Sequence, residues 1–118
     1  MPAFFLKINS TLVDPEWIFE IKTHHDGCIE LRYEEHRSTV FLPSWFKGRL
    51  EMTEKELREA YKKSEKLAES IACLILEAKE EYHALYDYFD DMSIVDITKL
   101  ETKLLEIFHG GNDKTEGD

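Results

Sequence analysis

Three histidines and a cysteine in the first third of the chain are the residues best suited to metal chemistry. His24, His25, Cys28 and His36 offer imidazole and thiolate groups, which are the usual ligands of zinc. His24 and Cys28 flank an expected turn, but His36 falls at the far end of the following strand, roughly 25 Å away at ~3.3 Å per residue. We therefore expect solvated turn residues here and no metal site.

A nucleophilic Cys–His pair is the second catalytic candidate. Cys28 would need its pKa lowered by His24 or His25, and Asp26 is too close in sequence to orient the base easily. Carboxylates are plentiful, but they fall on expected solvated helix faces rather than in a cleft. The chain has no glycine-rich phosphate loop, G-x-S-x-G elbow or EF-hand pattern. We predict no catalytic residues, no cofactor and no enzymatic activity; a small metal- or thiol-dependent enzyme is the alternative.

Acidic and aromatic side chains gather between Glu77 and Asp91. Tyrosine offers contact area with a polar handle, and acids steer basic partners. The alternative for Tyr86 and Tyr88, which fall partly off the apolar stripe of this segment, is that they pack under a second helix. The predicted partner-binding residues are Glu77, Glu80, Glu81, Tyr82, Tyr86, Asp87, Tyr88, Asp90 and Asp91.

The charge of the chain indicates what kind of partner to expect. The 118 residues carry 25 acids and 15 bases, a net charge of −10. Residues 77–118 hold 12 acids and 4 bases, so −8 of this charge lies in the C-terminal third. Such a balance argues against direct binding to nucleic acid or an anionic membrane and favours a protein partner with a basic surface.

The predicted function is a non-enzymatic protein-interaction module: an adaptor, a chaperone-like factor, or a regulator or inhibitor. It would act through a long helix and the acidic aromatic half of that helix. The alternative is an acidic nucleic-acid mimic that occupies the basic groove of a DNA- or RNA-handling enzyme. The carboxylates available for mimicry are Glu77, Glu80, Glu81, Asp87, Asp90, Asp91, Glu101 and Glu106.

Alternating apolar and polar side chains between turn signals predict strands within residues 3–43. Phe4, Leu6 and Ile8 share one face of a first strand, which ends before Pro15. A second strand begins at Trp17, with one half-buried face made of Trp17, Phe19, Ile21 and Thr23.

The loop between the second and third strands fixes their register. A two-residue loop at Asp26-Gly27 would oppose charged and apolar residues, so the pattern rejects it. A three-residue loop over 25–27, with Gly27 in the left-handed conformation, gives one apolar face and one face of opposite charges. The predicted pairs are Phe19–Tyr33, Ile21–Leu31, Thr23–Ile29, Glu20–Arg32 and Lys22–Glu30.

Residues 34–37 are expected to form a four-residue turn, which places Leu31 opposite Val40 and Ile29 opposite Leu42. The result is a three-stranded antiparallel β-meander, with the N-terminal strand as a fourth, edge strand. Its predicted core face is made of Phe19, Ile21, Ile29, Leu31, Val40 and Leu42.

A long helix starting at Thr53 is the clearest local signal. Thr53 and Glu56 have capping-box spacing, and Met52 and Leu57 occupy the hydrophobic-staple positions. Apolar or small residues then recur every three or four positions over about 54–89. Such a helix would be about 54 Å long, whereas a globule of this size is about 35 Å across. We expect its first half, to about residue 72, to lie on the sheet and its second half to extend beyond it.

A shorter helix over about 94–109, closed by Gly110-Gly111, is expected to fold back on the long helix as an αα-hairpin. Residues 1–111 would then form one α+β domain, followed by a disordered acidic tail over 112–118. A second copy of the chain is the alternative cover for the long helix, which would make a homodimer.

Cysteine use and apolar runs suggest the compartment. Cys28 and Cys73 fall in different expected elements and do not resemble a disulfide framework. The N-terminus lacks the basic region of a signal peptide, and no apolar stretch is long enough to span a bilayer. We expect a cytoplasmic protein.

Overall fold

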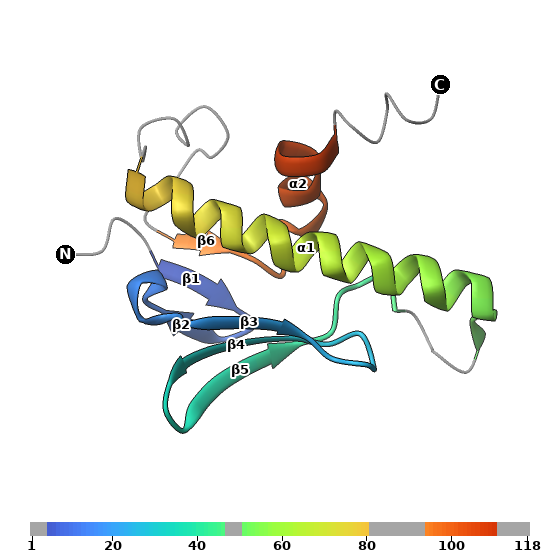
Figure 1. Cartoon of the computed structure of the whole chain (residues 1–118), viewed down its shortest axis with the longest axis horizontal. Coiled ribbons are helices and arrows are strands. Elements are labelled where there is room, and N and C mark those ends of the chain that lie inside the picture. Colours follow the sequence, from blue (N-terminus) through green and yellow to red (C-terminus); the bar gives the residue numbers. More distant parts are fainter. Residues whose placement is uncertain (1–4, 47–50, 81–93, 111–118) are drawn as a thin grey trace.

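The computed structural model describes residues 5–46, 51–80 and 94–110, and within them the fold is α+β (Figure 1). The strands form two three-stranded sheets, ordered β2-β1-β6 and β3-β4-β5. The strands are β1 (Phe5–Ile8), β2 (Thr11–Val13), β3 (Glu20–Thr23), β4 (Ile29–Glu34), β5 (Arg37–Phe41) and β6 (Ile94–Asp96). The helices are α1 (Glu54–Glu80) and α2 (Glu101–Leu105), with single helical turns η1 (Pro15–Trp17) and η4 (Glu106–Gly110).

The hairpin of β3 and β4 has the predicted register. Ile21 lies opposite Leu31 and Lys22 opposite Glu30, and the His24 N–H donates to the Cys28 carbonyl at 2.8 Å to close the loop. Gly27 has a φ of +94°, the left-handed conformation that the three-residue loop requires. Four of the five predicted pairs form, because the partners are near in sequence and only one register separates apolar from charged residues. The predicted Phe19–Tyr33 pair does not form: the ladder ends at Glu20–Arg32, and the Phe19 N–H donates to the Arg32 carbonyl at 3.0 Å.

The prediction for β4 and β5 is wrong by one residue. Leu31 lies opposite Thr39 and Ile29 opposite Phe41, and the turn closes tightly at the Glu34–Arg37 pair with an irregularity after Arg32. A shift of one residue moves every side chain of a strand to the other face. Phe41 is therefore buried, whereas Val40 and Leu42, predicted to face the core, are exposed.

The N-terminal strand does not extend the meander as predicted. β1 pairs antiparallel with β2 and parallel with β6, so it forms the centre of the other sheet. Its Leu6 and Ile8 side chains are fully buried, as the alternation indicated. Asn9, with a φ of 57°, turns the chain between β1 and β2.

The start of α1 confirms the predicted capping box. The Glu56 N–H donates to Thr53 Oγ1 at 3.1 Å, and the Thr53 N–H donates to Glu56 Oε1 at 2.9 Å. The Thr53 hydrogen bonds hold the pKa of the Glu56 carboxyl below its usual range. The first turn of α1 is therefore fixed by residues that the sequence itself places three apart.

The core lies between α1, the two sheets and α2. Its fully buried members from α1 are Leu67, Ile71 and Leu74. At the side of this core, the Trp45 indole N–H donates to Ser64 Oγ at 3.0 Å, which satisfies a hydroxyl that is itself buried. The core members from the remaining elements are Leu6, Ile8, Ile29, Leu31, Phe41, Val95, Ile97, Leu104 and Leu105.

The predicted helix over 94–109 starts later than expected. Residues 94–96 form β6, because pairing with β1 satisfies their backbone and buries Val95, and helical structure begins at Glu101. The C-terminal helical segment does pack on α1, with His109 Nε2 3.9 Å from Glu69 Oε2. The predicted tail over 112–118 and the helical residues expected over 81–89 lie outside the described residues.

α1 passes beside β3 and, contrary to the prediction, has not left this sheet at residue 72 (Figure 1). Leu57 and Tyr61 line a hollow with His25 in the β3–β4 loop. At the other end, Ile75 and Leu76 still lie beside the start of β3. The helix therefore forms a wall along the whole length of this strand.

Candidate functional site

The partner-binding residues predicted from the sequence fall at the end of α1 and beyond it. Glu77 and Glu80 belong to the last turns of α1. Glu81, Tyr82, Tyr86, Asp87, Tyr88, Asp90 and Asp91 lie outside the described residues. The acidic aromatic segment therefore stays a prediction.

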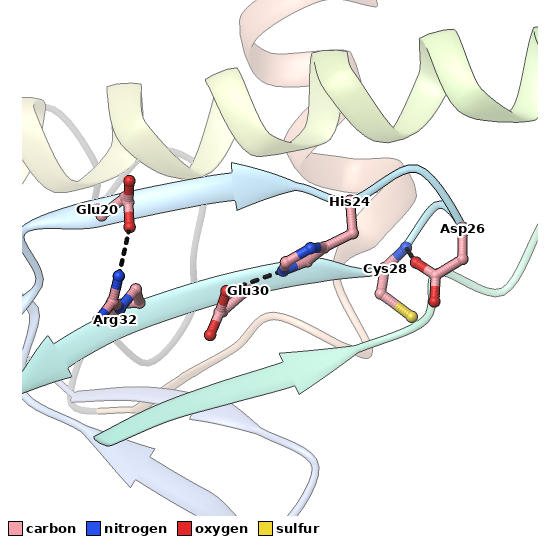
Figure 2. A network of polar contacts seen from close by, with 6 residues as sticks. All are labelled: Glu20, His24, Asp26, Cys28, Glu30 and Arg32. Atoms are coloured by element: carbon pink, nitrogen blue, oxygen red, sulfur yellow. Dashed lines mark hydrogen bonds and ion pairs between the residues drawn. The ribbon is translucent and has the colours of Figure 1, made fainter. Parts of the chain in front are cut away.

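Of the residues considered for zinc, His24 and Cys28 are neighbours at the β3–β4 hairpin, whereas His36 is far from them. His24 Nε2 is 2.8 Å from Glu30 Oε1, while Asp26 Oδ1 accepts from the Cys28 N–H at 3.0 Å (Figure 2). His36 lies in the turn between β4 and β5, at the opposite end of β4. In residues 5–46, 51–80 and 94–110, no group of three or more His, Cys, Asp and Glu side chains is placed to hold a metal ion. Cys28 and Cys73 are not joined in a disulfide.

The polar side chains on the outer face of the β3-β4-β5 sheet pair with one another. Glu20 Oε1 lies 3.3 Å from Arg32 Nη1, and Glu30 contacts His24 (Figure 2). A hydrogen bond from the Ser38 side chain, and then the one from His24, holds the pKa of the Glu30 carboxyl below its usual range. These charges are satisfied across strands, as expected for cross-strand pairs.

An apolar groove separates β3 from the C-terminal part of α1, and we call it the β3–α1 groove. Its volume is about 340 Å³. Phe19 and Leu76, which both line this hollow, are 61% and 57% exposed, which is unusual for apolar side chains of this size. Its lining residues are Ile18, Phe19, Glu20, Ile21, Ala72, Ile75 and Leu76.

Turn η1 explains why Phe19 and Trp17 are exposed, although the alternation from Trp17 predicted a core face. Asp14 Oδ1 accepts from the Glu16 N–H at 2.9 Å, and Pro15 occupies the first position of the turn. This helical turn interrupts the alternation, so β3 starts only at Glu20. Trp17 is 65% exposed as a result. Asp14-Pro15 is the sequence signal for this turn, because proline is favoured at the first position of a helical turn.

The guanidinium of Arg32 connects the outer face to the groove. It lies 5.6 Å from the centroid of the Phe19 ring while it pairs with Glu20. Arginine over an aromatic face is a favourable contact and restrains the ring. Phe19 is thus held in place at the rim of the groove although most of its surface is exposed.

Two other hollows have a different character. One, of about 260 Å³, lies near the β3–β4 loop and includes Arg58, His25 and Asp26. The other, of about 380 Å³, lies beside Trp45 and includes Glu56, Glu59 and Lys63. The β3–α1 groove is the most apolar of the three in its residues, with Glu20 as its one charged lining residue.

The chemistry of the groove favours binding over bond making. Its walls are hydrocarbon and one carboxylate, and they include no nucleophile with an adjacent base. Among the described residues, no helix combines the length and apolar character needed to cross a membrane. No family model matches this chain, and no match was found among curated proteins or solved structures.

Proposed function

We propose that this chain is a non-enzymatic protein-interaction module that binds an apolar side chain of a partner in the β3–α1 groove. The observation that carries the proposal is that two exposed apolar side chains, Phe19 and Leu76, line the same open hollow. A few buried side chains, often aromatic, supply most of the affinity of protein interfaces. Trp17, also exposed and two residues from Phe19, enlarges the surface that a partner would cover.

The charge around the groove favours a partner with basic residues. Glu20 lines the groove, and Glu65 is exposed two turns before Ala72 on the same face of α1. The net charge of −10 would also speed the encounter with a basic partner. The acidic aromatic residues predicted over 77–91 follow Leu76 directly in the chain, and we propose that they extend this surface.

Nucleic-acid mimicry is less well supported. Mimicry needs carboxylates spread over one continuous exposed surface. Glu101, one of the carboxylates available for it, is only 5% exposed and accepts a hydrogen bond from the Ser44 N–H at 3.2 Å. Glu101 therefore joins α2 to the segment after β5 and is not part of an outward array.

The test is affinity capture from an extract of the cell that makes the protein, comparing three forms of the chain. The double variant Phe19→Ala/Leu76→Ala alters the groove, whereas Leu12→Ala removes a side chain of similar exposure (54%) from the other sheet. We expect a protein that the wild type and Leu12→Ala capture and the groove variant loses. If every captured protein is retained by the groove variant, the proposal is wrong.

The salt concentration of the washes separates this proposal from mimicry. A complex anchored by apolar side chains persists in high salt, because burial of apolar surface is not screened. A complex made mainly by charge dissociates under the same conditions. Loss of all partners in high salt would therefore favour an electrostatic mimic.

A further inference from the structure

The hollow of about 260 Å³ near the β3–β4 loop lies where this loop meets the first turns of α1, and we call it the loop–α1 hollow. It shares no lining residue with the β3–α1 groove. Leu57, Arg58 and Tyr61 line it from α1, and His25 and Asp26 line it from the loop. Two separate segments of the chain therefore bound a second site.

The apolar base of the loop–α1 hollow is built before any ligand arrives. Phe46 also lines the hollow and is only 7% exposed. Its ring packs directly on Gly27, where a Cβ would lie 2.3–2.7 Å from three ring atoms. Hydrogen bonds close the loop itself, from the Gly27 N–H to the His24 carbonyl at 2.9 Å and from the His24 N–H to the Cys28 carbonyl at 2.8 Å. Preformed apolar walls of this kind are usual in small-molecule sites.

Arg58 and His25 are the polar side chains of the hollow that the fold leaves for a ligand. Both are exposed, and within residues 5–46, 51–80 and 94–110 neither side chain takes part in a hydrogen bond or ion pair. Asp26 is instead used inside the loop, where its Oδ1 accepts from the Cys28 N–H at 3.0 Å (Figure 2). A guanidinium donates paired hydrogen bonds to carboxylates and phosphates. The remaining polar groups therefore suit an anion.

We propose that the loop–α1 hollow binds a small aromatic anion, whose ring covers Phe46 and whose carboxylate or phosphate accepts from Arg58. Phe46 and Tyr61 favour a ring, because aromatic groups pack well edge to face or offset. The volume limits the ligand to about one ring, since sites for drug-sized ligands have about 300–1,000 Å³. This activity is additional to the proposed protein binding and does not depend on it.

The local charge is compatible with an anionic ligand although the whole chain is acidic. Of the net charge of −10, −8 belongs to residues 77–118, which leaves −2 for residues 1–76. Lys55 and Lys62 lie three residues before and four residues after Arg58 on α1, so all three cations share one side of the helix. They raise the potential at the mouth of the hollow.

The experiment measures binding of phenylacetate, phenyl phosphate and the neutral phenylacetamide to the whole chain by isothermal titration calorimetry. We expect at least one of the anions to bind, and phenylacetamide to bind about tenfold more weakly or worse, because it forms no charge-assisted hydrogen bond. The tighter of the two anions identifies carboxylate or phosphate as the preferred group. Hexanoate, an anion without a ring, should bind more weakly than phenylacetate.

Two exposed cations of α1 make a matched pair of variants. Arg58→Gln should weaken binding of the anions about tenfold or more and bring them close to phenylacetamide. Lys62→Gln removes the same charge one turn away from a residue that does not line the hollow, and should change the affinity less than about threefold. Both side chains are exposed, so both variants should fold.

Several results would overturn the proposal. They are the absence of binding by both anions at millimolar concentration, equal binding of phenylacetate and phenylacetamide, and full affinity in Arg58→Gln. The groove variant Phe19→Ala/Leu76→Ala should bind the anions as the wild type does; loss of binding there would place the ligand in the other hollow. Because capture of a partner protein is measured separately, failure of this site leaves the proposed function standing.

Discussion

The two sides of β3 differ in what they leave for a partner. On the outer face, Glu20 pairs with Arg32, and His24 with Glu30, so the charged groups are satisfied within the sheet. Along the edge beside α1, exposed apolar side chains line a hollow. A face rich in charge can thus have its side chains partnered within the fold. The apolar edge instead keeps exposed surface, on which the proposed binding depends.

The strongest test of this contrast compares two leucines of α1. Leu74 is fully buried, so Leu74→Ala should lower the free energy of unfolding by about 2–5 kcal/mol through loss of contacts and a residual cavity. Leu76→Ala should change it by less than about 0.5 kcal/mol. Chemical denaturation measures both, and equal losses would mean that the groove is part of the core.

The next largest effect on stability is expected in the β3–β4 loop, at Gly27. A Cβ on Gly27 would lie 2.3–2.7 Å from ring atoms of Phe46, and the residue has a left-handed φ. We expect Gly27→Ala to cost about 2–4 kcal/mol from strain and overpacking, measured by thermal unfolding. Phe46→Leu in the same chain should recover part of this loss; no recovery would assign the cost to the backbone alone.

The wall of the groove depends on where α1 starts. Thr53→Ala removes the side chain that accepts from the Glu56 N–H and should cost about 1 kcal/mol. Thr53→Ser keeps the hydroxyl and serves as the matched control, with little change expected in the denaturation midpoint. A Thr53→Ala chain as stable as the Thr53→Ser chain would show that the cap contributes nothing.

A substitution on the outer face should have the smallest effect on the free energy of unfolding, and this effect should depend on pH. Because the folded state lowers the pKa of Glu30 below its ordinary value of 4.5, its contribution is present above that value. It is lost as the pH falls through the folded pKa. Glu30→Gln should cost about 1 kcal/mol at neutral pH and much less in acid, which denaturation at several pH values would measure. A cost that stayed constant with pH would argue against the charged pairs.

Features of this chain that depend on nearby residues were predictable, and features that depend on tertiary contacts were not. The capping box and the β3–β4 register were predictable, because their partners are three to twelve residues apart and only one arrangement satisfies both polarity and hydrogen bonding. The register of β5 was not predictable. Both Val40 and Phe41 are apolar, and the register shift between Arg32 and Glu34 decides which of them is buried.

The residues of the proposed site were not among those that the sequence predicted. The sequence pointed to protein binding by the long helix, but it assigned Phe19 to the core face and placed the contacts after residue 76. Leu76 could be suspected, since Ile71 to Leu76 is apolar nearly all round the helix and one side of such a segment must face something other than the sheet. The exposure of Phe19 depends on turn η1, for which Asp14-Pro15 is the signal in the sequence.

By itself, the sequence determined the start of α1, the first hairpin of the β3-β4-β5 sheet and the α+β class, since short-range patterns fix these features. The tertiary structure decided that β1 pairs with β6 from the far end of the chain and that α1 stays beside β3. It also decided that a groove remains between them. Such contacts join segments whose own patterns allow several partners, and only the packing of the whole chain selects one.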